Sequence, residues 1–239
     1  MLLALSIRDV RPATPRARSV RVDLNGAAFT YTAGQAVKVG SRGADTRKPY
    51  SIAAAPEDAR RDDCLELLVG VDAEGAAGAH LALAPGAPVD VEGPFGTFTF
   101  PNEPQEQRFI FIAGGTGIAP LRAMLRHALG IPHQEIGLFY SARTPDEFAY
   151  EAELRELAAM RRIELRQTVT RVDSGAGWVG ARGRLDRAAL AELVHDPATL
   201  CFICGPSTLV DEMPKRLGDL GIPPSRIRIE EWGPPATSI

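Results

Sequence analysis

Cysteine is scarce in this chain of 239 residues, and an odd count of three argues against a disulfide framework. An excess of charge of one sign is also missing. The formal net charge is −3, so the composition does not indicate binding to nucleic acid or to an anionic membrane. No apolar run is long enough to cross a bilayer. Residues 1–16 lack the basic region and cleavage site of a signal peptide, so we expect a first strand there and a cytoplasmic protein with reduced thiols.

Two of the cysteines, Cys201 and Cys204, form a Cys-x-x-Cys pair that could indicate a redox or metal site. The pair lies in an apolar run, residues 200–204, that reads as a strand. A spacing of three then places the two sulfurs on opposite faces of the strand. No second Cys or His pair completes a zinc site. We therefore predict neither a metal nor a disulfide at this pair.

The first part of the chain is rich in short apolar stretches separated by glycine-containing turns. This spacing is typical of a β-barrel or a β-sandwich. Only residues 76–84 show a possible helical pattern. The expected strands are 3–7, 19–24, 36–39, 50–53, 65–71, 88–92 and 97–100.

Residues 101–107 are polar, contain two prolines and form the predicted linker. After the linker, apolar runs alternate with helical patterns, which predicts a doubly wound parallel sheet with ligands bound at the carboxyl ends of its strands. We expect an all-β domain over residues 1–103 and an α/β domain over residues 107–239. The expected strands of the second domain are 109–113, 135–141, 163–169, 200–204 and 226–230, and its expected helices are 120–129, 147–160, 186–193 and 207–220.

A glycine-rich turn, Gly114-Gly115-Thr116-Gly117, follows the first apolar run of the second domain. A helical pattern with Pro120 in its first turn comes next, which completes half of a nucleotide-binding βαβ unit. Glycine lets a ligand approach the backbone closely, and the first amides of the helix can bind phosphate. The motif departs from G-x-G-x-x-G at Pro120, so an ordinary strand–helix turn is the alternative interpretation.

Four short motifs then occur in a characteristic order along the chain. They are Lys48-Pro49-Tyr50-Ser51, Gly93-Pro94-Phe95-Gly96, Gly114-Gly115-Thr116-Gly117 and Cys204-Gly205-Pro206. In this order the chain resembles the ferredoxin–NADP reductase family of flavoproteins. The resemblance implies an N-terminal antiparallel Greek-key β-barrel that binds FAD and a doubly wound NAD(P)-binding domain. It also implies hydride transfer from NAD(P)H to flavin N5.

The resemblance gives the first motif a role at the flavin. Tyr50 would lie along the isoalloxazine ring, Ser51 would bond near N5, and Lys48 would neutralise the pyrophosphate. Lysine replaces the family's arginine and cannot form a bidentate contact, so Arg47 is an alternative source of that charge. An ordinary strand aromatic beside a hydroxyl is the structural alternative for Tyr50 and Ser51.

A second flavin element of the family is a glycine, two residues and a Ser or Thr that opens a short helix. Here Gly75 begins the element and Gly78 stands in place of the hydroxyl, while backbone amides remain able to bind phosphate. The resemblance implies FAD, and the lost side-chain bond at Gly78 leaves FMN as the alternative. His80 is expected to be a packed or surface residue. The implied flavin-binding residues are Arg47, Lys48, Pro49, Tyr50, Ser51, Leu68, Val69, Gly75, Ala77, Gly78 and Ala79.

The resemblance also places the nicotinamide coenzyme. Thr116 and Cys204 would position the nicotinamide ring, and with Ser51 they form the implied catalytic set. Nothing adjacent in sequence lowers the pKa of Cys204, so we do not expect a nucleophile. Trp232 would shield the flavin or, alternatively, cover the sheet edge. The implied coenzyme contacts are Gly115, Thr116, Gly117, Pro120, Cys204, Gly205 and Pro206.

The choice of coenzyme depends on the ends of two strands. Ser141 and Arg143 follow one strand, and Thr170 and Arg171 follow the next. Two arginines and two hydroxyls suit the 2′-phosphate of NADPH, so NADP(H) is favoured over NAD(H). Solvated loop arginines are the alternative interpretation.

The electron acceptor is expected to be a separate molecule. Three cysteines cannot supply the four thiolates of an iron–sulfur cluster, and no haem-type domain is evident. A ferredoxin, a flavodoxin, an oxygenase component or a small oxidant would serve. Lys48 and Gly78, which depart from the family pattern, favour a non-catalytic nucleotide-binding or electron-routing subunit as an alternative, and a free-flavin reductase is another. The sequence leaves the acceptor, the oligomeric state and the redox potential open.

Overall fold

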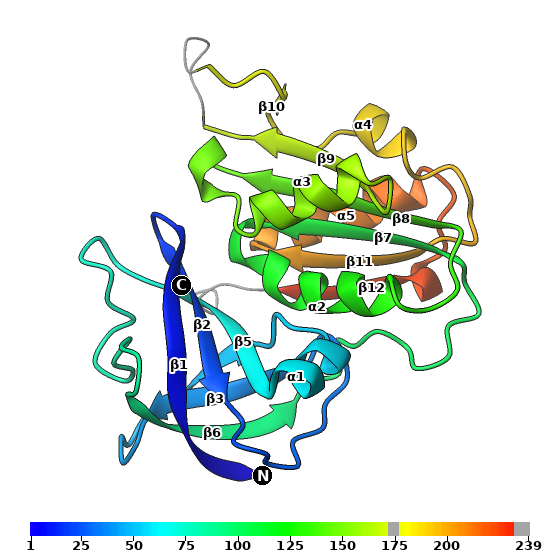
Figure 1. Ribbon diagram of the computed structural model, residues 1–239. Coiled ribbons are helices and arrows are strands. Elements are labelled where there is room, and N and C mark those ends of the chain that lie inside the picture. The colour runs from blue at the N-terminus through cyan, green and yellow to red at the C-terminus, as the bar shows by residue number, and fades with distance from the viewer. Residues whose placement is uncertain (172–176, 232–239) are drawn as a thin grey trace, which may run out of the picture. The chain divides into compact units, whose positions relative to one another are not determined.

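The structure is a computed structural model that describes residues 1–171 and 177–231 (Figure 1). The chain forms two compact units. Unit 1 consists of Met1–Asn102 together with Arg122–His127, and unit 2 consists of Glu103–Leu121 and the chain from Ala128 onward. Within the described ranges, no helix is both long and apolar enough to cross a membrane.

Unit 1 is built on a six-stranded antiparallel sheet with the strand order β4-β3-β6-β1-β2-β5. An isolated antiparallel bridge between Ile52, which follows β4, and Leu67, in the middle of β5, joins the two outer strands, so the sheet closes on itself. This arrangement confirms the predicted N-terminal antiparallel Greek-key barrel. Its elements are β1 (Leu2–Thr14), β2 (Ala17–Asp23), β3 (Ala36–Ser41), β4 (Lys48–Ser51), α1 (Pro56–Asp62), β5 (Cys64–Gly70) and β6 (Pro88–Phe95).

The core of unit 1 follows from the two-residue period of its strands. Alternate residues of β2 and β5 are apolar and point to the same side, so Val20, Val22, Leu65, Leu67 and Val69 are all buried in one cluster. Of the residues between them, Arg21 and Glu66 are half-buried, and Leu68 is buried outside this cluster. The β1 and β2 strands form a hairpin in which Thr14 pairs with Ala17, and the register of the pair shifts between Pro12 and Thr14.

Two sequence predictions in unit 1 are wrong. Residues 97–100 do not form a strand, although Phe98 and Phe100 are buried, because their side chains anchor a loop that lacks a strand's ladder of backbone hydrogen bonds. Residues 76–84 do not form a helix, because Gly75 and Gly78 have φ of +83° and +94° and interrupt any helical path.

Helix α1 was not predicted, although its sequence carries ordinary helix signals. Pro56 occupies the first turn with two acidic residues, and two arginines occupy the last turn. Both charge placements favour a helix through its dipole. The helix ends at Asp63, which has a left-handed φ of 50°. With seven residues it is too short to show a clear 3.6-residue period.

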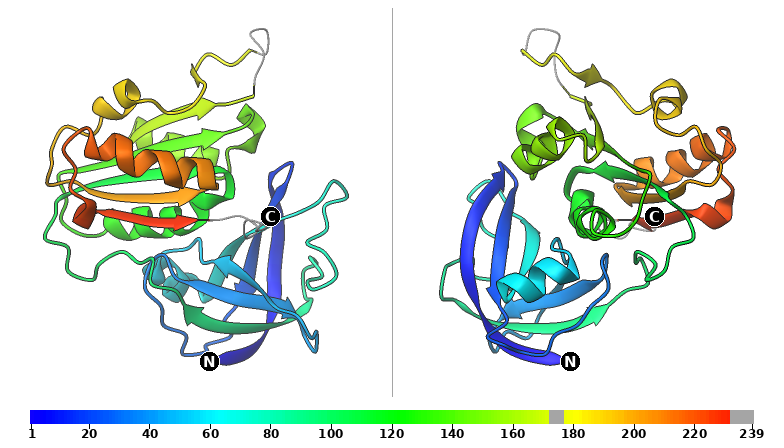
Figure 2. Two further views of the ribbon diagram at one scale, coloured as in Figure 1. Left: turned by 180° about the vertical axis from the view of Figure 1, so that it is seen from behind. Right: turned by 45° about the vertical axis from the view of Figure 1, so that its right-hand side comes forward.

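Unit 2 is an all-parallel sheet with the order β10-β9-β8-β7-β11-β12, and this confirms the predicted doubly wound domain. Helix α3 lies on one face of the sheet, and α4 and α5 pack on the other (Figures 1 and 2). The chain starts at β7, moves outward to β9, and then crosses to β11. The elements are β7 (Arg108–Gly114), α2 (Ile118–Ala128), β8 (Glu135–Ala142), α3 (Glu151–Ala159), β9 (Glu164–Val169), β10 (Ala181–Arg182), α4 (Arg187–Ala191), β11 (Leu200–Gly205), α5 (Ser207–Gly218) and β12 (Ile227–Glu231), with short 3-10 turns at Gly115–Gly117, Pro145–Glu147 and Pro224–Arg226.

The neighbouring strands β7 and β11 read as continuous apolar runs because helices or loops cover both faces of a parallel sheet. Cys201 and Ile203 belong to the core beneath α4 and α5. By alternation, Phe202 and Cys204 face the opposite side, where Phe202 stacks on Phe111 with ring centroids 5.4 Å apart. In the part of the chain that the structure describes, no group of His, Cys, Asp or Glu side chains could hold a metal ion.

Candidate functional site: two glycine turns and a flavin-type strand

The strand order of unit 2 reverses between β7 and β11, and the turns that follow these two strands touch. A Cβ on Gly117 would stand 2.3 Å from the carbonyl oxygen of Cys204, and one on Gly114 would stand 2.7 Å from Cδ of Pro206. No real side chain fits at such distances. Glycine is therefore required at both positions, and the two turns meet where the strand order reverses, which is the place where doubly wound sheets bind ligands.

The turn after β7 leads directly into a helix. Gly115 has a φ of +54°, Thr116 is exposed, and α2 begins at Ile118. The first amides of a helix have no partner within it, and they carry its positive dipole end. Pro120 lies in the first turn of α2 and is buried. The predicted coenzyme residues Gly115, Thr116, Gly117 and Pro120 therefore lie together at one helix start.

A buried tyrosine holds this turn in place. The Tyr140 hydroxyl of β8 donates to the carbonyl of Gly115 and accepts from the amide of Ala149, both at 3.1 Å. The ring of Phe148 packs edge-on against Tyr140, with centroids 5.0 Å apart. Burial raises the pKa of Tyr140, so the hydroxyl keeps the proton that it donates. The sequence analysis missed Tyr140, whose only signal is a hydroxyl in an otherwise apolar strand.

Cys204 lies at the other turn and is fully buried. Burial, together with the neighbouring charge of Glu230 on β12, raises the pKa of the Cys204 thiol far above its usual range. Burial also raises the pKa of Cys201 to about 12. Both sulfurs are therefore thiols rather than thiolates at neutral pH, and neither has the character of a nucleophile. Gly205 and Pro206 continue the turn into α5.

The ends of β8 and β9 bring the four predicted coenzyme-selecting residues side by side. The amide of Arg171 donates to the carbonyl of Arg143 at 2.8 Å, and the amide of Thr170 donates to Ala142 at 3.0 Å. Both arginines are exposed, and neither forms an ion pair with any residue between 1 and 171 or 177 and 231. Ser141, which lies two residues before Arg143 on β8 and pairs with Thr168 of β9, is half-buried. Two uncompensated guanidinium groups thus lie at neighbouring strand ends.

In unit 1 the flavin-type motif occupies β4. Tyr50 is buried, its hydroxyl lies 2.7 Å from Nε2 of His80, and the two rings are nearly parallel with an interplanar angle of 12°. Burial raises the pKa of Tyr50 to about 12. Ser51 is also buried, and its Oγ has no hydrogen-bond partner among the described residues. An orphaned buried hydroxyl is costly unless a ligand satisfies it, so Ser51 fits a flavin contact.

The two basic residues before Tyr50 differ in their surroundings. Arg47 is half-buried and forms an ion pair with Glu92 at 3.2 Å, so its charge is already compensated. Lys48 is exposed and has no ion pair within the described residues, and Pro49 beside it is also exposed. Lys48 is thus the free cation of the motif.

The second flavin element, around Gly75 and Gly78, is a turn rather than the start of a helix, which corrects the sequence prediction. The amide of Leu81 closes this turn on the carbonyl of Gly78 at 3.3 Å, and the amide of Ser41 donates to the backbone carbonyl of His80 at 2.7 Å. The guanidinium of Arg18 on β2 lies against Gly75, where a Cβ would stand 3.0 Å from its Nη2. The sequence analysis missed this cation. Of the remaining predicted residues, Ala77 is half-buried, Ala79 is exposed, and Leu68 and Val69 are buried on β5.

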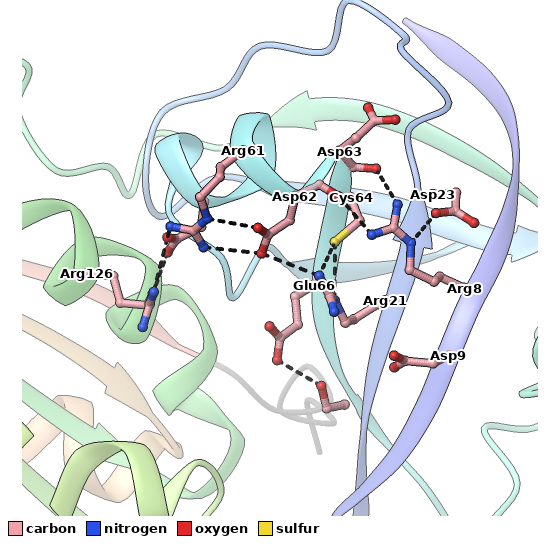
Figure 3. A network of polar contacts seen from close by, with 12 residues as sticks. Arg8, Asp9, Arg21, Asp23, Arg61, Asp62, Asp63, Cys64, Glu66 and Arg126 are labelled. Carbon is pink, nitrogen blue, oxygen red and sulfur yellow. Dashed lines mark hydrogen bonds and ion pairs between the residues drawn. The ribbon is translucent and has the colours of Figure 1, made fainter. Parts of the chain in front are cut away.

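A charged network in unit 1 connects α1, β2 and β5 with residues of α2 (Figure 3). Arg122 is buried, donates to the carbonyl of Ala53 at 2.8 Å, and lies 3.3 Å from Glu66. Asp58 is paired with Arg126. These groups line a hollow of about 50 Å³ with Arg21, Ala54, Arg61, Asp62 and Cys64. The ion pairs compensate most of its charge, so we assign the network to stability rather than to coenzyme binding.

Two further features of the sequence analysis are placed as follows. Gly93, Pro94 and Phe95 form the end of β6, where Lys38 Nζ lies 5.6 Å from the centroid of the Phe95 ring, and Gly96 follows the strand. Trp232 lies outside the described residues.

Comparison with known proteins assigns the family. Residues 111–215 match the family described as "Oxidoreductase NAD-binding domain". The chain is 34% identical over 241 residues to "Ferredoxin--NADP reductase B" of Sorangium cellulosum, covering 93% of this chain and 94% of the relative. The chain belongs to the ferredoxin–NADP reductase family. The predicted resemblance is thereby confirmed, and the chain is an oxidoreductase of a family that binds FAD and NAD(P).

Solved structures of family members have the same fold. Amycolatopsis cytochrome P450 reductase GcoB gives a TM-score of 0.81 at 27% identity and covers 98% of this chain and 71% of that one. A ferredoxin NADP⁺ reductase from Neisseria gonorrhoeae, solved with bound FAD and NADP, gives 0.75 at 19% identity and covers 96% of this chain and 98% of that one. The second likeness is one of fold alone.

Proposed function

We propose that this chain is an FAD-dependent NAD(P)H reductase that favours NADPH and passes electrons to a separate acceptor. A ferredoxin, a flavodoxin, an oxygenase component or a small oxidant would serve as that acceptor. The single observation that carries the proposal is the contact between the turn at Gly117 and the turn at Cys204, because these turns meet at the reversal of strand order, where doubly wound sheets bind ligands. The three cysteines are free and buried, which suits a reducing compartment such as the cytoplasm.

We assign the flavin to the first domain, residues 1–103. FAD, when bound, supplies the two-electron chemistry. Ser51 would donate to the flavin ring, Tyr50 would pack against it, and Lys48 would neutralise its phosphates. Arg47 is a weaker candidate for that role because Glu92 already holds it. The remaining proposed contacts are Pro49, Leu68, Val69, Gly75, Ala77, Gly78 and Ala79, with Trp232 from the C-terminal end of the chain.

We assign the coenzyme to the second domain, residues 107–239. Thr116 and Cys204 would position the nicotinamide, and the amides at Gly115 and Gly117 would bind the pyrophosphate. Pro120, Gly205 and Pro206 shape the surrounding turns. Proximity and orientation are the main contribution of these residues to the rate.

The preference for NADPH rests on Arg143 and Arg171. Their exposed guanidinium groups follow neighbouring strands and are joined through their backbones, so both can reach one anionic group. Arginine matches a phosphate with bidentate, charge-assisted hydrogen bonds. Ser141 and Thr170 would add neutral hydroxyl contacts.

The test is an anaerobic titration of the purified, FAD-loaded chain. We expect a flavin absorption band that bleaches with one equivalent of NADPH and more slowly with NADH. A flavin band that neither coenzyme bleaches would indicate the alternative, a non-catalytic nucleotide-binding or electron-routing subunit. Turnover that requires excess flavin would indicate a free-flavin reductase. The turn at Gly78, which supplies no hydroxyl, is the observation that favours these weaker-binding alternatives.

A further inference from the structure

The imidazole of His80 is buried, and only one of its two nitrogens is accounted for. The side chain is 6% exposed, and Nε2 lies 2.7 Å from the Tyr50 hydroxyl. Nδ1 is also buried, but it has no hydrogen-bond partner among the residues that the structure describes. A buried polar atom without a partner needs an explanation, and an absent ligand is one.

The protonation of His80 follows from its surroundings. Burial, and then the positive charge of Lys48, lowers the pKa of His80, so the ring is neutral at pH 7 and carries one N–H. The Tyr50 hydroxyl keeps its proton, because its pKa is about 12. If the hydroxyl donates to Nε2, only Nδ1–H is left unpaired. If Nε2–H donated instead, both the hydroxyl proton and the Nδ1 lone pair would be unpaired, so the first arrangement is favoured.

Other unused donors lie beside Nδ1. A Cβ at position 78 would stand 3.6 Å from Nδ1, in ordinary contact distance, so glycine keeps this side of the ring free of a side chain. The backbone amides of residues 77–80 donate to no group within the described chain. The uncompensated charge of Lys48 acts on the same imidazole. Donors and positive charge without a matching acceptor indicate an anion site.

We propose that His80 is a phosphate ligand, and that Nδ1–H binds a phosphate of the flavin nucleotide together with the amides of the Gly78 turn. This inference rests on the proposed function, because it takes the flavin as the source of the phosphate. In this arrangement Tyr50 fixes the tautomer of His80, and Gly78 places no side chain against Nδ1. A ring nitrogen then supplies the contact that a hydroxyl at position 78 would otherwise make.

The competing explanation is that His80 only orients Tyr50. Two substitutions separate the explanations, because the amide of asparagine can stand near Nδ1 and that of glutamine near Nε2. His80→Gln keeps a partner for Tyr50 and removes the donor at Nδ1. His80→Asn keeps that donor and removes the partner of Tyr50. Tyr50→Phe removes only the hydroxyl and serves as the matched control.

The experiment measures dissociation constants of FAD, FMN and riboflavin by fluorescence, with thermal melting to check that each variant folds. We expect His80→Gln to weaken FAD and FMN binding about 10- to 100-fold and to leave riboflavin, which has no phosphate, unchanged. His80→Asn should bind FAD within a few-fold of the parent chain. Nitrogen-15 NMR of the parent chain should show the Nδ1–H tautomer both free and with FAD.

Three results would overturn the assignment. The first is that His80→Gln binds FAD as tightly as the parent chain. The second is that His80→Asn and Tyr50→Phe are the variants that lose FAD binding, which would make His80 a positioning residue for Tyr50. Equal losses for riboflavin and FAD would also exclude a phosphate contact. In all three cases the parent chain still binds flavin and the proposed function stands. A folded parent chain that binds none of the three flavins would instead overturn the proposed function.

Discussion

The Tyr140 hydroxyl and the Gly115 carbonyl lie 3.1 Å apart, and this bond fixes the turn that opens α2. Tyr140→Phe removes it and leaves the amide of Ala149 without its acceptor. We expect a loss of about 1–3 kcal/mol in the free energy of unfolding and a several-fold rise in the dissociation constant for NADP⁺. Urea unfolding and calorimetric titration measure the two effects.

The matched control for that variant is Tyr31→Phe in unit 1, whose hydroxyl donates to the carbonyl of Ala54 at 2.8 Å. It removes one buried tyrosine hydroxyl far from the glycine turn in sequence, so it should lower stability without changing coenzyme affinity. If both variants weakened NADP⁺ binding equally, the effect would be one of general stability, and the role of Tyr140 would be refuted.

Arg143 and Arg171 should select between the coenzymes. Replacing either arginine with alanine is expected to raise KM for NADPH about tenfold or more and to leave KM for NADH nearly unchanged, because only NADPH has the 2′-phosphate. Steady-state kinetics with both coenzymes test this. Arg155→Ala, which breaks only an exposed ion pair with Glu151, should change neither value. Equal losses for both coenzymes would contradict the assignment.

Asp58 should make the chain sensitive to acid. Burial opposes ionisation of its carboxyl, but the hydrogen bonds and charges of Arg126 and Arg61 outweigh burial and hold the pKa of Asp58 below its usual range. A carboxyl whose pKa is lowered by folding stabilises the protein above its unfolded pKa of about 3.9, and this stability is lost as the pH falls through the folded pKa.

Asp58→Asn should therefore lower the free energy of unfolding at pH 7 by about 1–2 kcal/mol and reduce the loss of stability below about pH 4. Urea unfolding between pH 3 and pH 7 measures both. Asp211→Asn, on an exposed position of α5, should leave the pH dependence unchanged. If the Asp58 and Asp211 variants showed the same dependence of the free energy of unfolding on pH, the ion pairs of Asp58 would not be the source of the acid sensitivity.

Gly117 should tolerate no side chain. In Gly117→Ala the new Cβ would overlap the backbone of Cys204, and the two turns would have to separate. We expect a loss of about 1–3 kcal/mol in stability and weakened coenzyme binding. Gly218→Ala, where nothing lies within 4 Å of the new atom, is the control and should be neutral or slightly stabilising in thermal melts.

The sequence predicted best where one physical rule decides the structure. Parallel strands buried on both faces are continuous apolar runs, so β7 and β11 were located within one or two residues. The meeting of the strand ends at Arg143 and Arg171 followed from the parallel topology alone. These rules do not predict which side chains meet when their positions are distant in sequence. For this reason the hydrogen bond from Tyr140 to Gly115 and the ion pair of Arg47 with Glu92 were not predicted.

Local conflicts explain the remaining errors. The stretch around Gly78 has apolar residues at helical spacing, but two left-handed glycines decide its path. Helix α1 is too short for periodicity to reveal it, and Phe98 and Phe100 are buried like strand residues although they belong to a loop. Only at Phe98 and Phe100 did tertiary packing outweigh the local pattern.

The burial of all three sulfurs has a practical consequence for handling the protein. Cys64, Cys201 and Cys204 are each at most 3% exposed, so an alkylating reagent such as iodoacetamide can reach them only when the surrounding structure opens. Mass spectrometry after brief treatment should find the native chain unlabelled and the urea-unfolded chain labelled three times. The rate of labelling at each cysteine would then report how often its strand separates from its neighbours, without any substitution in the chain.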